Sequence, residues 1–288
     1  MDILKALSDG MKTLDEAKRP WDETKLHISD LGVWSGLKES DRKCPRQLWY
    51  RLRGRRQEPM TDGKRLMFSQ GNRIEELAIS ALKTQGVVES AKVNVSDLCI
   101  TGETDVLLKD PETGELVIVD VKTRRGNAFR FNNLVKPAEK MQVIGYAIKL
   151  ENRPGCPMIH RGAILEIDRE GQNFARVFEF DIRQKEYSEY KEAYSEILYI
   201  QDSKEPPAGL KPTLIRKENK GQDSLKLNIP WQCRYCNYAK TCCVCVPSAE
   251  FLEMHGKVVG HVLETDGGEI ITIQEEYLDF KTKETDDE

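Results

Sequence analysis

Hydrophobic residues recur at helical spacing in five segments of the chain. Apolar positions three and four residues apart form one face of an amphipathic helix. Gly54 and Gly86 follow two of these segments, and Pro137 is the first residue of another, as is typical of helix ends and helix starts. The pattern therefore predicts helices over residues 2–17, 40–53, 65–84, 137–150 and 187–200.

Residues typical of β-strands dominate the stretches before and after the fourth of these helices. The sequence Asp110-Pro111-Glu112-Thr113-Gly114 is a strong turn signal between two such stretches, so we expect a β-hairpin there. Strands are predicted over residues 87–95, 98–108, 116–123, 158–167 and 175–182. Strands and helices in this order favour an α/β core.

Length and charge narrow the class of protein. The 288 residues suit one large domain or two small ones. No apolar run approaches 18 residues and the first residues lack the layout of a signal peptide, so we expect no transmembrane helix and a cytoplasmic protein. The net charge of −4 hides an asymmetry: residues 247–288 carry 12 Asp or Glu against three Lys, whereas residues 42–65 carry nine Lys or Arg against two acids.

Two acids and a lysine lie on the strands that flank the predicted turn. Asp120 and Lys122 are two residues apart and point to the same face of one strand, and Asp105 can lie close to both from the partner strand. Two carboxylates beside an ammonium within apolar strands are costly unless they bind something. Magnesium and manganese prefer such oxygen ligands. A bound ion would polarise a phosphodiester, and the lysine would orient or deprotonate the attacking water.

Two helices supply further candidates. Glu75 ends a Gly-x-x-x-Glu sequence on the helix before the strands, and Glu76 is a neighbour that points about 100° away around the helix. Gln142 and Tyr146 are four residues apart and share one face of the helix after the hairpin. Each pattern also has an ordinary interpretation: surface ion pairs for the acids and the lysine, and a half-buried tyrosine beside a glutamine.

Taken in order, these motifs resemble a known family. Gly-x-x-x-Glu, an Asp at the end of one strand, Asp-x-Lys on the next and Gln-x-x-x-Tyr on the following helix resemble the PD-(D/E)xK nucleases of the RecB-like branch. The resemblance implies a restriction-endonuclease-like fold, with a mixed central sheet flanked by helices. The catalytic residues that it implies are Glu75, Asp105, Asp120, Lys122, Gln142 and Tyr146. The implied ligands of a magnesium or manganese ion are Glu75, Asp105, Asp120 and the peptide carbonyl of Val121.

Five of the eight cysteines fall within thirteen residues of the C-terminal part. A secreted disulfide scaffold would be shorter and its cysteines more evenly spread, so a cluster that starts C-x-x-C favours metal ligation. The expected thiolates are those of Cys233, Cys236, Cys242 and, from far upstream, Cys44. Cys243 and Cys245 are near enough to compete. Four thiolates suit zinc or an iron–sulfur cluster, and one C-x-x-C pair with a distant lone cysteine favours the cluster.

The cysteine pattern extends the resemblance. A Cys-Pro before the core and C-x2-C-x5-C after it resemble the iron–sulfur exonucleases, among them the CRISPR-associated exonucleases of the Cas-four type. The resemblance implies that Cys44, Cys233, Cys236 and Cys242 hold a structural 4Fe–4S cluster. We therefore expect four parts: an N-terminal helical segment (1–64), a nuclease core (65–202), a linker with a cluster-pinned helical and loop lobe (203–246), and an acidic tail (247–288).

The basic segment indicates a nucleic-acid partner. Phosphate contacts from Lys and Arg supply salt-dependent affinity that does not depend on sequence. The residues that we expect to bind DNA are Arg46, Arg51, Arg53, Arg124 and Arg125. Trp49, Tyr50 and Trp231 either stack on the bases of a single strand or pack in the core.

The expected function is metal-dependent cleavage of DNA, exonucleolytic and on single-stranded ends. Two alternatives stay open. One is a DNA-binding adaptor subunit of a recombination, repair or CRISPR-adaptation complex, with protein partners and little activity alone. The other is a zinc-binding scaffold protein. Robust cleavage by the purified chain would exclude the first, and the visible absorption of an iron–sulfur cluster would exclude the second.

Overall fold

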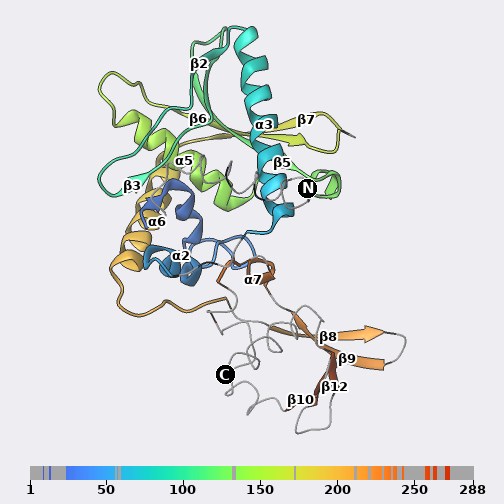
Figure 1. Cartoon of the computed structure of the whole chain (residues 1–288). Coiled ribbons are helices and arrows are strands. Elements are labelled where there is room, and N and C mark those ends of the chain that lie inside the picture. Colours follow the sequence, from blue (N-terminus) through green and yellow to red (C-terminus); the bar gives the residue numbers. More distant parts are fainter. Residues whose placement is uncertain are drawn as a thin grey trace. The chain divides into compact units, whose positions relative to one another are not determined.

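The apolar segment after the turn at residues 110–114 forms the central strand of a sheet, β5 (Leu116–Arg124). In the computed structural model (Figure 1) this sheet has five strands in the order β2-β4-β5-β6-β7. The other strands are β2 (Val88–Ala91), β4 (Val106–Lys109), β6 (Arg161–Asp168) and β7 (Ala175–Asp181). Because β5 and β6 are parallel and the other neighbours antiparallel, the predicted mixed sheet is confirmed.

The chain divides into two units. The first comprises Met1–Lys43, Arg51–Arg55 and Pro59–Pro206, and the second Cys44–Tyr50, Arg56–Glu58 and Pro207–Glu288. The residues that the structure describes are 9, 13, 24–55, 57, 60–131, 134–171, 173–210, 213–219, 222–228, 230–234, 236–238, 242, 257–259, 262–264 and 270–272. The helix predicted over residues 2–17, the competing cysteines at 243 and 245, and most of the acidic tail lie outside them.

Helices cover both faces of the sheet. The helices of the first unit are η1 (Ile28–Val33), α3 (Asp62–Thr84), α4 (Gly126–Phe131), α5 (Pro137–Glu151) and α6 (Gln184–Asp202). Ile79 of α3 packs with Val119 on one face. On the other face, a Cβ at Gly162 would lie 2.8 Å from Cγ1 of Val143 in α5, so α5 lies close against β6. The restriction-endonuclease-like α/β fold is therefore confirmed, and strand alternation turns Asp120 toward α5.

Several predicted boundaries differ from the structure, among them the strand predicted over residues 87–95, which ends at Ala91, and two others differ for a local reason. The helix predicted from Ser40 is α2 (Pro45–Leu52), because turns occupy the residues before Pro45, a residue suited to a first helical turn. The strand predicted over residues 98–108 is two strands, β3 (Ile100–Thr101) and β4, with a loop between them. In that loop Gly102 packs closely against its neighbours, because a Cβ there would lie 2.9 Å from Cδ1 of Ile28 and 3.2 Å from Cε1 of Tyr146.

A segment that the pattern does not indicate completes the first unit. β1 (Leu26–His27) pairs in parallel with β3, and η1 packs on α5 and α6. Leu26, Ile28 and Leu31 are almost fully buried. Because β1 and η1 are so short, their apolar residues complete no recognisable period.

The second unit has a sheet of its own. Its strands run in the order β10-β11-β12-β9-β8, with β8 (Thr213–Asn219), β9 (Gln222–Asn228), β10 (Lys257–Val259), β11 (Val262–Glu264) and β12 (Ile270–Thr272). The short helix α7 (Trp231–Arg234) follows β9. None of the described helices combines the length and hydropathy needed to cross a membrane.

Candidate active site

A cleft of about 520 Å³ opens in the first unit between α3, α5 and the loop before β4. Four of the residues predicted for catalysis line it: Glu75, Asp105, Gln142 and Tyr146. The neighbour Glu76 lines it too, as do three further ionisable residues that the motifs do not indicate: His27, Lys92 and Glu103. The predicted side chains from two helices and the hairpin therefore do come together.

Asp105 is held by the strand next to its own. Because Val106 pairs with Val119, the residue before β4 lies beside the following residues of β5. The Val121 amide donates a hydrogen bond of 2.8 Å to Oδ2 of Asp105. This bond fixes one carboxylate oxygen and leaves Oδ1 turned toward the cleft. The role predicted for the Val121 carbonyl stays a prediction.

Asp120 and Lys122 form an ion pair on β5, in which the acid is buried and the lysine half-buried. Lys122 Nζ lies 2.6 Å from Oδ2 of Asp120, whose side chain is 1% exposed. That oxygen nevertheless accepts no hydrogen bond of ordinary geometry from the described residues. Burial raises the pKa of Asp120 to about 7, against the Lys122 charge and together with the Asp105 charge. Burial opposes the charge on Lys122, but Asp120 and Asp105 outweigh it and raise the pKa of that ammonium.

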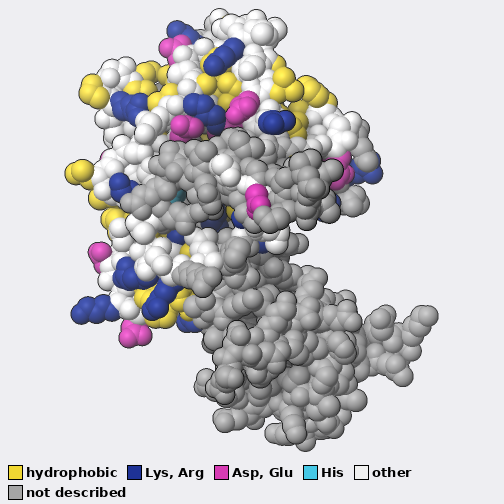
Figure 2. Space-filling view, viewed as in Figure 1, with side chains coloured by type: hydrophobic (Ala, Val, Ile, Leu, Met, Phe, Trp, Pro, Cys, Tyr) yellow, Lys and Arg dark blue, Asp and Glu magenta, His cyan; other side chains and the backbone are white. Residues whose placement is uncertain are grey.

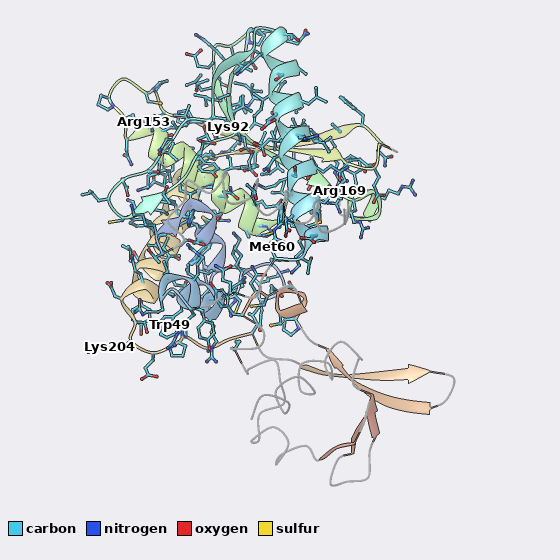
Figure 3. All side chains as sticks on the ribbon, viewed as in Figure 1. Trp49, Met60, Lys92, Arg153, Arg169 and Lys204 are labelled. Atoms are coloured by element: carbon cyan, nitrogen blue, oxygen red, sulfur yellow. The ribbon has the colours of Figure 1, made fainter. Side chains whose placement is uncertain are left out.

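Glu75 reaches the cleft from α3 and meets Lys92 there. Lys92 Nζ contacts Oε1 of Glu75 and lies 3.2 Å from Oδ1 of Asp105. Burial and the Asp105 carboxylate raise the pKa of Glu75, while the Lys92 ammonium lowers it. In Figure 3 the labelled Lys92 lies beside α3. The lysine therefore offsets the repulsion between two acids that converge from different elements.

Gln142 and Tyr146 share one face of α5, as their spacing predicts. Gln142 Nε2 donates a hydrogen bond of 2.8 Å to the Tyr146 hydroxyl. Burial, and then the charge of Asp120, raise the pKa of Tyr146, so the phenol keeps its proton. The Tyr146 oxygen accepts this hydrogen bond, so the hydroxyl can still donate its own proton to a group in the cleft.

The carboxylates fit a hard divalent cation in their chemistry. Of the acids at or beside the cleft, Glu75 and Asp120 have a raised pKa, and Asp120 also has a buried oxygen that lacks a regular hydrogen bond. Such groups gain most from a cation with oxygen preference. Among the described residues, no three His, Cys, Asp or Glu side chains already converge closely enough to hold an ion. Ammonium groups pair with these acids. Lys92 pairs with Glu75 and Asp105, and Lys122 pairs with Asp120.

The family model of the PD-(D/E)XK nuclease superfamily matches residues 3–243, which is most of the chain. The chain belongs to this superfamily. The match spans the cleft, the acidic hairpin and Cys44, Cys233, Cys236 and Cys242. No curated protein sequence matches the chain.

Several solved structures resemble the chain, among them the following three. The protein SSO0001 is 17% identical, with a TM-score of 0.46 over 83% of this chain and 95% of its own. An alkaline exonuclease from Laribacter hongkongensis is 12% identical, with a TM-score of 0.42 over 62% of this chain and 89% of its own. A phage-related exonuclease from Haemophilus somnus is 17% identical, with a TM-score of 0.41 over 62% of this chain and 93% of its own.

A second candidate site of this PD-(D/E)XK chain lies in the second unit. The four predicted thiols, those of Cys44, Cys233, Cys236 and Cys242, line one small cavity, and no disulfide joins them. Burial raises the pKa of Cys236 to about 12, against a hydrogen bond from the Tyr238 amide and together with the other three thiols. The predicted upstream partner, Cys44, is therefore brought to the C-x-x-C segment. Four thiols at one cavity are the ligand number of both zinc and iron–sulfur sites.

The arginines predicted to bind DNA mostly have partners within the chain. Arg51 pairs with Asp30, Arg46 donates to the Pro207 carbonyl, and Arg53 donates to two carbonyls. Arg124 pairs with Glu139 and with the buried Glu166. Arg53 and Arg125 are the exposed members of the five, and Arg125 lies 3.5 Å from Glu170. Figure 2 shows basic and acidic side chains interspersed over the described part of one face. Their DNA contacts stay a prediction.

Arg124 and Arg125 offer a matched test of these roles. Arg124→Ala is expected to lower the free energy of unfolding by roughly 3 kcal/mol, because Glu139 and the buried Glu166 then lose the positive charge of Arg124. Arg125→Ala is expected to leave the melting temperature unchanged and to weaken DNA binding about two- to tenfold, most at low salt. Thermal unfolding and fluorescence anisotropy with labelled single-stranded DNA measure both. Weaker binding by Arg124→Ala with unchanged stability would mean that Arg124 faces the DNA.

Proposed function

We propose that the chain is a magnesium- or manganese-dependent deoxyribonuclease that degrades DNA from single-stranded ends. Membership of the PD-(D/E)XK superfamily supports phosphodiester hydrolysis. The observation that carries the proposal is the shared cleft of Glu75, Asp105, Gln142 and Tyr146, with the Asp120–Lys122 ion pair on the adjoining strand. The exonucleolytic direction and the single-stranded substrate rest on the resemblance of the sequence motifs.

In this proposal Glu75, Asp105 and Asp120 hold the cation. A cation so held polarises the scissile phosphate and lowers the pKa of a bound water. The Val121 amide keeps Asp105 in place through its hydrogen bond to Oδ2. Since its pKa is raised, Lys122 acts as an ammonium that orients the water and offsets charge on the phosphate. Gln142 orients the Tyr146 hydroxyl, which can donate to a phosphate oxygen.

The thiol cavity supports a second part of the proposal, a structural 4Fe–4S cluster held by Cys44, Cys233, Cys236 and Cys242. Ligand thiols must lose their protons, so the raised pKa of Cys236 means that cluster binding would release a proton there and be favoured as the pH rises. This part would place the chain among the iron–sulfur exonucleases. DNA is then the partner, bound through phosphate contacts.

The test is cleavage of end-labelled single-stranded DNA by the purified chain during titration with Mg²⁺ or Mn²⁺. We expect no cleavage in EDTA, cleavage that saturates with the metal, and short products released from one end. An internally labelled circular single strand separates the two modes of cleavage. Resistance of the circle supports an exonuclease, and its rapid cleavage would replace that part of the proposal with an endonuclease. Inactivity on all DNA substrates at every metal concentration would refute it.

A further inference from the structure

Lys92 occupies a position in the cleft that no sequence motif assigns. It directly follows β2 and lines the cleft. Its ammonium contacts Glu75 Oε1 and lies 3.2 Å from Asp105 Oδ1. Glu75 comes from α3 and Asp105 from the loop before β4, so Lys92 joins two acids from different elements.

The backbone holds Lys92 in an unfavourable conformation at this place. Its φ is 54°, and no other non-glycine residue among those described has a positive φ. The left-handed region is costly for a residue with a Cβ, and such outliers cluster at functional sites. The Lys92 amide donates to the Asp105 carbonyl over 3.1 Å. Lys92 and Asp105 are thus fixed to each other through the backbone as well as through their side chains.

The ammonium and a divalent cation would need the same space. A cation bound by Glu75 and Asp105 contacts the oxygens that Lys92 now contacts, and the two positive groups would repel each other at close range. The Lys92 side chain is 41% exposed, and its four-carbon stem is flexible. It therefore has solvent into which it can move, whereas the two carboxylates are largely buried, at 20% and 13% exposed.

We propose that Lys92 is a built-in competitor of the active-site cation. In the metal-free chain its ammonium holds Glu75 and Asp105 together, and it leaves the space between them when the cation binds. This inference rests on the proposed function, because it takes Glu75 and Asp105 as metal ligands. Lys92 thereby weakens apparent metal affinity, since only the fraction of molecules with a displaced lysine accepts the ion.

Binding of Mn²⁺ to the full chain tests the competition without any cleavage assay. Lys92→Met keeps the length of the side chain and removes its charge, and Lys92→Arg keeps the charge. Lys109→Met changes an exposed lysine at the far end of β4 and is the matched control. Titration calorimetry is expected to show Mn²⁺ binding about tenfold tighter in Lys92→Met. The wild type, Lys92→Arg and Lys109→Met are expected to bind alike.

Thermal unfolding supplies a second readout of the same competition. In EDTA, Lys92→Met is expected to melt below the wild type, because Glu75 and Asp105 then repel each other without compensation. Saturating Mn²⁺ is expected to raise its melting temperature by more than that of the wild type. Equal or weaker Mn²⁺ affinity in Lys92→Met would overturn the competition and leave the proposed metal site intact. Absence of Mn²⁺ binding in all four proteins would overturn both.

Discussion

Asp120→Asn is expected to abolish DNA cleavage and, at the same time, to stabilise the metal-free chain. The substitution keeps the size of the side chain but removes the negative charge that a cation needs, so the cleavage rate should fall on the order of 10³-fold or more. Asp120 is 1% exposed and burial raises its pKa to about 7. A charged carboxylate there is a cost to the folded state that a neutral amide does not carry.

The pH dependence of stability follows from the same shift. The pKa of Asp120 in the folded chain, about 7, lies above its ordinary value of 3.8. Between these values the folded state holds a proton that the unfolded state has lost. The contribution of Asp120 to the stability of the wild type without metal should therefore be greatest below about pH 4 and be lost as pH rises through about 7.

Thermal unfolding in EDTA across this pH range, beside a cleavage assay in Mn²⁺, measures both effects. At pH 8 Asp120→Asn is expected to melt a few degrees above the wild type. Glu89→Gln, at an exposed acid on β2 of the same sheet, is the control and should change neither property. An active Asp120→Asn protein would remove Asp120 from the catalytic set. An inactive protein that melts well below the wild type would point to a structural role.

Cys44→Ser is expected to abolish the visible absorption of the purified chain and to cause partial unfolding. Cys44 and Cys233 are 189 residues apart in sequence and line one cavity. A cluster that joins them closes a long loop, and its binding energy contributes to folding. Cys44 is buried beside Leu210 and Cys233, so loss of the cluster would also leave a gap in this small core.

Iron analysis, the absorption spectrum and thermal unfolding together test this expectation. Cys99→Ser replaces an exposed thiol and should retain the full iron content and stability. Undiminished iron in Cys44→Ser would show that another thiol completes the site. If the wild type contains zinc and no iron, the four thiols remain the proposed ligands, but the ligand they bind is a zinc ion and not a 4Fe–4S cluster.

The pattern of the sequence predicts much of the central sheet and two residue pairs of the candidate active site. The hairpin of β4 and β5 follows from the turn residues 110–114, and α5 follows from Pro137 and an apolar stretch. Strand alternation alone puts Asp120 and Lys122 on one face. Helical spacing alone puts Gln142 and Tyr146 together. These are local relations, and the structure confirms all of them.

Some relations that depend on packing between distant segments could not be predicted from the residues. Lys92 meets Glu75 because its backbone takes a left-handed conformation against Asp105, and nothing in the residue itself indicates that. Arg124 lies two residues after Lys122 and is predicted from the sequence to contact DNA, but the parallel pairing of β5 with β6 brings Glu166 beside it. The short segment of β1 and η1 is buried on α5 only because Gly145 leaves room for Leu31 and Ile28.

Manganese anomalous scattering from a crystal of the full chain soaked in Mn²⁺ tests the central claim most directly. The account predicts one ion in the cleft, bound by Glu75, Asp105 and Asp120, with the Lys92 ammonium outside the space between the first two. Manganese bound elsewhere, with these carboxylates still paired to Lys92 and Lys122, would contradict it.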